Sequence, residues 1–187
     1  MILLTSHIDN VKMDIQSIKY EGGKVEGLLD NWVGNLVLYL TLFSNPIFKQ
    51  LELEGRIKIY HNTGEEFGLL IDAPTLKEGD MVINVDVCSN KDWDYDVVLD
   101  NCWNINTNKI KSFLEWEGYK VLVKKYTGKV EDEDESFEWI KRGIPTISFT
   151  IPIKSQNDGW HRTDSKCDYD TIKKASYILQ RVICYYV

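Results

Sequence analysis

The sequence predicts an α/β protein in which helices pack on a central, largely parallel or mixed β-sheet to form a three-layer sandwich. Strand-like and helix-like segments alternate along the chain, 43% of its 187 residues are hydrophobic, and 12% are aromatic. This composition can fill a core and excludes a disordered or fibrous chain. Neither an internal repeat nor a Pro/Ser-rich linker interrupts the chain, so a single domain over residues 1–187 is expected.

The first half of the chain alternates between apolar runs and one helical pattern. Buried or alternating runs predict strands at Ile2–Thr5, Val11–Ile18, Arg56–His61 and Met81–Val87. Between the second and third of these runs, Gly22-Gly23 marks a turn. Apolar residues then recur at helical spacing, at Val33, Leu36, Val37, Leu40 and Phe43. We therefore expect a helix that begins near Asn31 and ends before Asn45-Pro46.

The second half continues the alternation. Strands are predicted at Val97–Leu99, Tyr119–Tyr126 and Ile144–Ile151, and helices at Asn106–Glu117, Phe137–Lys141 and Thr171–Tyr185. Asp170 is the expected N-cap of the last helix. The acidic run EDEDE, residues 131–135, predicts a solvated loop because five successive carboxylates repel one another. The alternative interpretation of this run is a rim beside an active site.

Charge and cysteine usage exclude several classes of function. The net charge is −7 and no basic block is present, so nucleic acid is not an expected partner. No apolar run approaches the roughly 20 residues needed to cross a bilayer, and the N-terminus MILLTSHID lacks the basic region of a signal peptide. The cysteines are widely spaced and form no CxxC pair, which predicts reduced, mostly buried thiols in a cytoplasmic protein: Cys88, Cys102, Cys167 and Cys184.

Polar residues follow the first predicted strand and precede the first long helix. His7 and Asp9 form a His-x-Asp pair, and side chains two apart in an extended segment share a face. Asp9 can therefore orient the imidazole of His7, as carboxylates do for metal-bound histidines. Asp30 and Asn31 lie just before the helix, where a simple N-cap is the alternative interpretation.

Three further positions complete the set of candidate residues. Glu65 and Glu66 lie between two glycines shortly after a predicted strand, where α/β sheets place their ligands. Asp86 comes near the end of a strongly apolar strand, and a carboxylate there is costly unless it is paired or coordinated. His161 lies in the segment DGWHRTD.

Taken together, these residues are suitable ligands for two Zn²⁺-like ions. Five side chains suffice if one carboxylate bridges the ions. His7, Asp30 and Asp86 would hold one ion, and Asp30, Glu66 and His161 the other. Each ion then has three protein ligands and an open position for water, which is the pattern of catalytic sites rather than structural ones. Zinc is expected, with cobalt or manganese as alternatives.

In this order the residues resemble the co-catalytic di-zinc exopeptidases, which include bacterial leucyl aminopeptidases and related carboxypeptidases and deacylases. The resemblance is carried by His7, Asp9, Asp30, Asn31, Glu65, Glu66, Asp86 and His161. The segment ESFEWIKRGIPTISF, residues 135–149, also resembles the family's short helix and Gly-Ile-Pro before a late core strand. The resemblance implies the zinc-exopeptidase fold, of the phosphorylase/hydrolase-like type, with a central mixed sheet.

The resemblance also implies roles for these residues. Asp30 would bridge the two metals and be joined to Asn31 by a cis peptide, Glu65 would be the general base beside the ligand Glu66, and Asp9 would support His7. Twenty residues separate Asp9 from Asp30, and 74 separate Asp86 from His161. These spacings leave no room for an inserted domain or a lid, so the closest expected architecture is a single-domain aminopeptidase.

Two departures from the family pattern concern the sheet and the substrate contacts. The chain begins almost at the His-x-Asp motif, which predicts a smaller sheet with a less covered edge that a homo-oligomer would protect. The family's acidic-Ser-Asp-His motif is present only as Asp134-Glu135-Ser136.

The leading hypothesis is an aminopeptidase acting on a peptide or small amide, with no nucleic acid or membrane as partner. One alternative is a deacylase or carboxypeptidase of the same superfamily, for which Arg142 or Arg162 would hold the substrate carboxylate. Another is a non-catalytic metal- or peptide-binding protein, which would have no need of a general base such as Glu65. A Cys167–His161 nucleophile pair is the weakest alternative.

Overall fold

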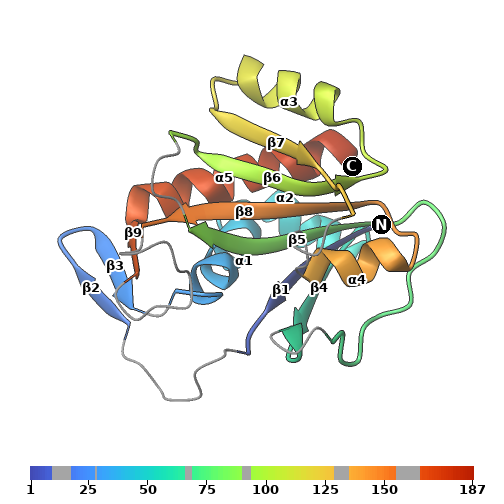
Figure 1. Ribbon diagram of the computed structural model, residues 1–187, viewed down its shortest axis with the longest axis horizontal. Helices are drawn as coiled ribbons and strands as arrows, with labels where there is room; N and C mark the ends of the chain where they lie inside the picture. Colours follow the sequence, from blue (N-terminus) through green and yellow to red (C-terminus); the bar gives the residue numbers. More distant parts are fainter. Residues whose placement is uncertain (10–17, 28, 66–68, 90–93, 129–134, 155–164) are drawn as a thin grey trace.

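The computed structural model describes residues 1–9, 18–27, 29–65, 69–89, 94–128, 135–154 and 165–187. Within them the chain forms a six-stranded mixed sheet with helices on both faces and a second sheet of three strands (Figure 1). This arrangement confirms the predicted α/β class and its central mixed sheet.

The six-stranded sheet brings the ends of its parallel strands together. Its order is β4-β1-β5-β8-β6-β7. The strands are β1 (Ile2–His7), β4 (Ile57–Asn62), β5 (Met81–Ser89), β6 (Val97–Trp103), β7 (Val121–Lys125) and β8 (Thr146–Ile153). Strands β4, β1, β5 and β8 are parallel, whereas β6 is antiparallel to β8 and parallel to β7. The carboxyl ends of β1 and β5 therefore lie side by side, at the edge where α/β sheets bind ligands.

The two faces of this sheet are covered by different helices. One face carries α1 (Trp32–Phe43), α2 (Pro46–Leu53), α3 (Thr107–Trp116) and α5 (Tyr169–Tyr186). Strand residues such as Leu4, Ile83 and Phe149 join helix residues such as Val37 and Leu179 in the main core. The short helix α4 (Glu135–Lys141) packs on the opposite face, where Trp139 contacts Leu3 and Val82. Figure 1 shows α4 in front of the sheet and α5 behind it.

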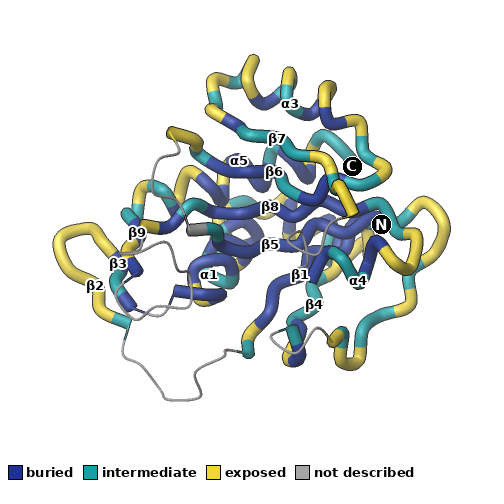
Figure 2. Tube along the Cα trace, viewed as in Figure 1, coloured by how far each residue is buried: buried dark blue, intermediate teal, exposed yellow. Residues whose placement is uncertain are grey.

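The three-stranded sheet lies at one end of the molecule. It consists of β2 (Lys19–Glu21), β3 (Lys24–Gly27) and β9 (Ser165–Asp168) in antiparallel order β2-β3-β9. Gly22 and Gly23 form the turn between β2 and β3 with φ of 57° and 78°, as the sequence predicts for this pair. The tip of this hairpin is exposed, whereas the strands of the central sheet are mostly buried (Figure 2).

The structure adds one helix and corrects two local expectations. Asn45-Pro46 begins α2 rather than only ending α1, because the Asn45 side chain accepts from the amide of Ile47 and proline suits the first turn. Helix α5 begins at Tyr169 with Asp168 at the N-cap position, so Asp170 lies in the first turn. Glu135, expected in a solvated loop, begins α4 and is buried. The predicted strand Val11–Ile18 lies almost entirely outside the described residues.

The four cysteines differ in their exposure. All four are free; Cys102 and Cys167 are buried, Cys88 is half-buried and Cys184 is exposed. Among the helices of the described residues, none is both long enough and apolar enough to span a membrane.

Candidate metal centre

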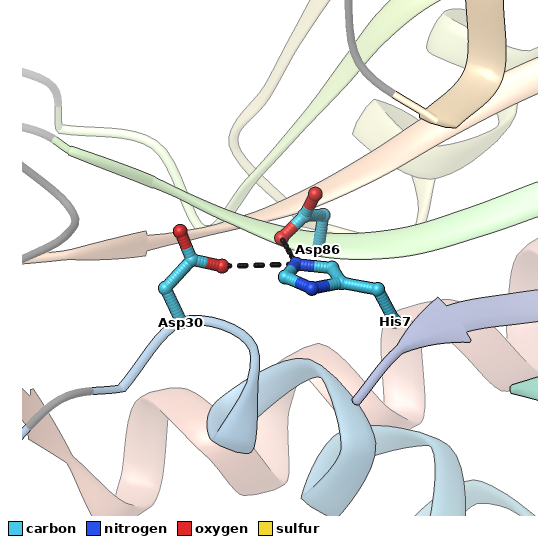
Figure 3. Close-up of side chains that lie close together, drawn as sticks. All are labelled: His7, Asp30 and Asp86. Atoms are coloured by element: carbon cyan, nitrogen blue, oxygen red, sulfur yellow. Dashed lines mark hydrogen bonds and ion pairs between the residues drawn. The ribbon is translucent and has the colours of Figure 1, made fainter. Parts of the chain in front are cut away.

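Three buried side chains converge at the carboxyl ends of β1 and β5. His7 is the last residue of β1, Asp86 lies on β5, and Asp30 comes just before α1. The His7 Nε2 atom lies 3.1 Å from Asp30 Oδ1 and 3.5 Å from Asp86 Oδ1. Figure 3 shows both carboxylates turned toward this nitrogen. In the described part of the chain, these three form the group whose ligand atoms all lie within 4.8 Å of one another.

The turn before α1 is held in place by Asn31. Its side-chain oxygen accepts from the amide of Gly34 at 3.0 Å, and its Nδ2 donates to the carbonyl of Val85 at 2.7 Å. Asn31 is therefore an N-cap and also a link to β5, which fixes Asp30 beside Asp86. A Cβ at Gly34 would lie 2.0 Å from Asn31 Oδ1, so this position requires glycine. The peptide bond between Asp30 and Asn31 is cis, as the resemblance implies.

The other nitrogen of the His7 ring, Nδ1, lies near Asp9 and Glu65. His7 Nδ1 lies 3.2 Å from the carbonyl oxygen of Asp9 and 3.6 Å from its carboxylate. Glu65 Oε2 lies 3.7 Å from the same nitrogen. A hydrogen on Nδ1 that is directed to Asp9 leaves Nε2, the nitrogen facing Asp30 and Asp86, with its lone pair available for a cation.

Electrostatics at this cluster favour a cation. Burial by itself would lower the pKa of His7, but the surrounding carboxylates, chiefly those of Asp86 and Asp30, raise it well above its usual range. Burial raises the pKa of Asp86; His7 opposes that rise, whereas Asp30 adds to it. The site thus gathers several buried acids around one imidazole and stabilises positive charge there. An imidazole nitrogen with two carboxylate oxygens is a donor set that fits zinc, cobalt or manganese.

The structure places five of the seven residues predicted for the site in one cluster. His7, Asp30 and Asp86 lie together, and Asp9 and Glu65 adjoin His7. Glu66 and His161, the predicted ligands of the second ion, lie outside the described residues.

Sequence reasoning missed one buried acid near this cluster. The charges of His7 and Asp86 both act on the pKa of Glu135, which is buried at the start of α4. Two signals in the sequence involve Glu135: its place at the start of the segment that resembles the family's short helix, and the partial motif Asp134-Glu135-Ser136. The acidic run 131–135 instead favoured the interpretation of Glu135 as part of a solvated loop.

The two arginines named for a substrate carboxylate do not strengthen the deacylase alternative. Arg142 follows α4 and its guanidinium stacks on the Trp139 ring at 5.2 Å from the centroid. Trp139 packs on Leu3 and Val82, at the amino ends of the strands and away from His7. Arg162 lies outside the described residues.

Comparison with known proteins gives the family of this chain. The sequence profile of Peptidase family M28 matches residues 1–187. The chain belongs to this family. Its membership confirms the predicted resemblance, because M28 is a family of metal-dependent peptidases.

Solved structures with the same fold include several aminopeptidases. The TET1 peptidase of Pyrococcus horikoshii, which can assemble into a tetrahedron or a large octahedral shell, gives a TM-score of 0.63 at 12% identity, covering 90% of this chain and 52% of that one. Yeast aminopeptidase 1 gives 0.56 at 13%, covering 92% and 51%. Aminopeptidase APDkam598 of Desulfurococcus kamchatkensis gives 0.55 at 15%, covering 90% and 51%. At these identities the likeness concerns the fold, and this M28 chain spans about half the length of each structure.

One curated protein is also similar over part of its sequence. An uncharacterized ATP-dependent helicase of Methanocaldococcus jannaschii is 28% identical over 112 residues, which is 57% of this chain and 15% of the helicase. A match limited to so small a part of the helicase carries no activity over to the M28 chain.

Proposed function

We propose that this M28 protein hydrolyses a terminal peptide bond with the help of two divalent cations, and that it acts as an aminopeptidase. The observation that carries this proposal is the buried His7–Asp30–Asp86 cluster with Glu65 beside it, at the carboxyl edge of a parallel sheet. We expect zinc in the site, with cobalt or manganese able to replace it.

We assign the ligands from the imidazole and carboxylate groups of the predicted site, which are the donors that zinc-like ions prefer. His7 Nε2 and the carboxylates of Asp30 and Asp86 would hold one cation. Asp30, Glu66 and His161 would hold the other, with Asp30 shared between the two. Asp9 would accept a hydrogen bond from His7 Nδ1 and so fix the ring orientation. When bound, such cations lower the pKa of water and polarise the carbonyl of the bond to be cleaved.

Glu65 is the residue we assign to proton transfer. Its carboxylate is only partly buried, which leaves it accessible to water and substrate. Glu65 would accept a proton from the attacking water on a carboxylate oxygen and deliver it to the nitrogen of the leaving amine. The same acidic surroundings suit a substrate with a protonated terminal amine, which supports an aminopeptidase over an enzyme that must bind a terminal carboxylate.

Release of nitroaniline from aminoacyl-p-nitroanilides, with and without a chelator, tests this function. We expect hydrolysis that the chelator abolishes, that added Zn²⁺ or Co²⁺ restores, and that N-acetylation of the substrate prevents. Activity that is unaffected by chelation would contradict the metal mechanism. Cleavage of N-acetyl amino acids in place of aminoacyl substrates would favour a deacylase. Tight metal binding without hydrolysis of a broad peptide panel would favour a binding protein.

We also propose that the protein forms a homo-oligomer. In the described sheet β4 is an edge strand, and unpaired strand edges favour association. Next to it along the chain, α1 and α2 expose apolar side chains: Phe43 is 69% exposed and Leu53 is 73% exposed. Light scattering coupled to size-exclusion chromatography should give a mass above 21.8 kDa, the mass of one chain. A monomer at all concentrations would contradict this proposal.

A further inference from the structure

The side chains beneath the metal centre form successive layers on the α4 face of the sheet. Residues two apart on a strand point to the same face, so Leu3, Thr5 and His7 on β1 share it. On β5 the corresponding residues are Val82, Asn84 and Asp86, and the register pairs Leu3 with Val82 and Thr5 with Asn84. An apolar layer, a polar layer and the metal-binding layer therefore follow one another toward the carboxyl edge.

Helix α4 covers the first two layers with two residues one turn apart. Trp139 packs on Leu3 and Val82 in the apolar layer. Glu135, four positions earlier on the same helix face, lies about 6 Å further along the axis, which is close to the roughly 6.6 Å advance of two strand residues. Glu135 is therefore placed over the polar layer, where the Thr5 hydroxyl and the Trp139 indole act on its carboxyl group.

In the part of the chain that the structure describes, the polar layer contains buried polar atoms that make no hydrogen bond of full geometry. Thr5 donates its hydroxyl hydrogen to Asn84 Oδ1 at 3.0 Å. Glu135 is 3% exposed, yet within the described residues neither of its carboxyl oxygens makes a hydrogen bond of full geometry, and neither does Asn84 Nδ2. Unpaired buried polar groups are costly, and an apolar side chain at position 135 would avoid the cost. A role of the Glu135 carboxyl group in supporting the adjoining metal centre would account for an acid at this buried position.

The charge of Glu135 responds to the centre. Burial raises the pKa of Glu135 to about 8, the Thr5 hydroxyl and the charge of His7 oppose the rise, and the Asp86 carboxylate adds to it. Positive charge at the centre thus favours the ionised form, and negative charge favours the neutral acid. Bound cations would therefore lower the pKa of this carboxyl group and favour its carboxylate form.

We propose that Glu135 is a positioning residue of the metal centre. It holds the Thr5–Asn84 layer beneath His7 and Asp86, and it places a carboxylate behind the bound cations. This inference rests on the proposed metal centre, and it adds an acid that acts through the ligand-bearing strands without being a ligand. Outer carboxylates that support metal ligands contribute 10- to 100-fold in affinity, roughly the effect we expect here.

Metal affinity in Glu135→Gln tests the proposal. Metal-free protein would be titrated with Co²⁺, following the visible absorption of the bound ion and competition with a chromogenic chelator. We expect affinity to fall by about tenfold or more, with an altered absorption spectrum. The matched control is Glu138→Gln on the same helix, where the side chain pairs with Lys141 at the surface and affinity should not change.

A second pair of variants covers the case in which the first does not fold. Thr5→Val removes the hydroxyl but keeps the branched shape, whereas Thr5→Ser keeps the hydroxyl. We expect Thr5→Val to weaken Co²⁺ binding and Thr5→Ser to retain it, with far-UV circular dichroism and urea unfolding confirming that each variant is folded.

Two outcomes separate this inference from the proposed function. Folded Glu135→Gln that binds Co²⁺ within twofold of wild type would overturn the role of Glu135, whether or not the protein is a peptidase. Wild-type protein that binds Co²⁺ but cleaves no aminoacyl substrate would overturn the aminopeptidase and leave the affinity test of Glu135 in force.

Discussion

The two faces of the central sheet differ in chemistry although they are made by the same strands. Toward α1 and α5, side chains such as Leu4, Ile83 and Phe149 are fully buried in an apolar core. Toward α4, the alternate positions of β1 and β5 change from apolar at the amino end to His7 and Asp86 at the carboxyl end. Strand alternation thus allows one segment of six residues, β1, to serve stability on one side and chemistry on the other.

This difference between the two faces predicts which property a substitution on each face will change. Changes on the α1–α5 face remove apolar contacts and should reduce the free energy of unfolding. Changes on the α4 face near the carboxyl edge should reduce metal affinity or turnover while leaving the fold in place. A variant that changes stability and metal affinity together would contradict this distinction between the faces, and a variant that changes only one of them would support it.

The largest effect is expected for Glu65→Gln, which should reduce turnover without changing stability. Loss of a general base lowers kcat by about 10²- to 10⁴-fold, because the amide cannot accept a proton from the attacking water. Metal content and unfolding by urea should match wild type. Steady-state kinetics on aminoacyl-p-nitroanilides measures the effect, with the exposed Glu78→Gln as the matched charge control. A kcat within threefold of wild type would assign proton transfer to another group.

On the apolar side, Phe149→Ala should be the most damaging change of this set. Phe149 on β8 is fully buried, and replacing such a ring by alanine costs roughly 3–5 kcal/mol of stability. Urea unfolding of metal-free protein measures it. Trp116→Ala removes an aromatic ring at a position 82% exposed and should cost less than about 0.5 kcal/mol. Similar losses for the two variants would mean that the α1–α5 core does not dominate stability.

The buried acid of the α4 face should make stability depend on pH. In metal-free protein, burial raises the pKa of Glu135 to about 8, above the ordinary value of 4.5 that applies to the unfolded chain. Between these values the folded state binds more protons than the unfolded state, so this contribution to stability is lost as pH rises from about 4.5 to 8. The loss over this pH interval is roughly 4 kcal/mol.

Comparison with Glu135→Gln isolates that contribution, because the charged and titratable groups that face it, His7, Asp86 and Tyr60, are present in both proteins. Urea unfolding would be measured in the presence of a chelator at pH 5 and at pH 8. Wild type should lose stability relative to the variant over this interval. A constant difference between the two proteins would show that Glu135 keeps an ordinary pKa.

Sequence patterns anticipated which polar residues lie close together where those residues stand at the ends of regular elements. His7, Asp30 and Asp86 each lie at or near the end of an apolar strand or the start of a helix, and parallel strands bring such ends together. The same reasoning placed the main strands and most helices. The exposed hairpin β2–β3 was missed because β2 has no buried side chain to produce an alternating pattern.

Glu135 was assigned wrongly for a physical reason. Its neighbours in the sequence are acidic, and local charge favours solvent. Burial of Glu135 depends instead on which strand residues α4 covers, and that is decided by the register of β1 and β5 over 79 residues of separation. Sequence patterns report local preference and periodicity, whereas a polar layer assembled from three distant segments has no local signature.

The smallest effect expected here concerns Asp9, which contacts the far side of the His7 ring. Asp9→Asn keeps the backbone carbonyl that lies 3.2 Å from His7 Nδ1 and removes only the negative charge of the carboxylate at 3.6 Å. Loss of such support typically weakens metal binding by about 10- to 100-fold, and the retained carbonyl places this variant near the lower limit. Co²⁺ titration should therefore give a loss of about tenfold, with turnover of the metal-saturated enzyme reduced less than in Glu65→Gln. Because the carbonyl of residue 9 can orient the ring by itself, unchanged Co²⁺ affinity in Asp9→Asn would identify the backbone, and not the carboxylate, as the group that positions His7.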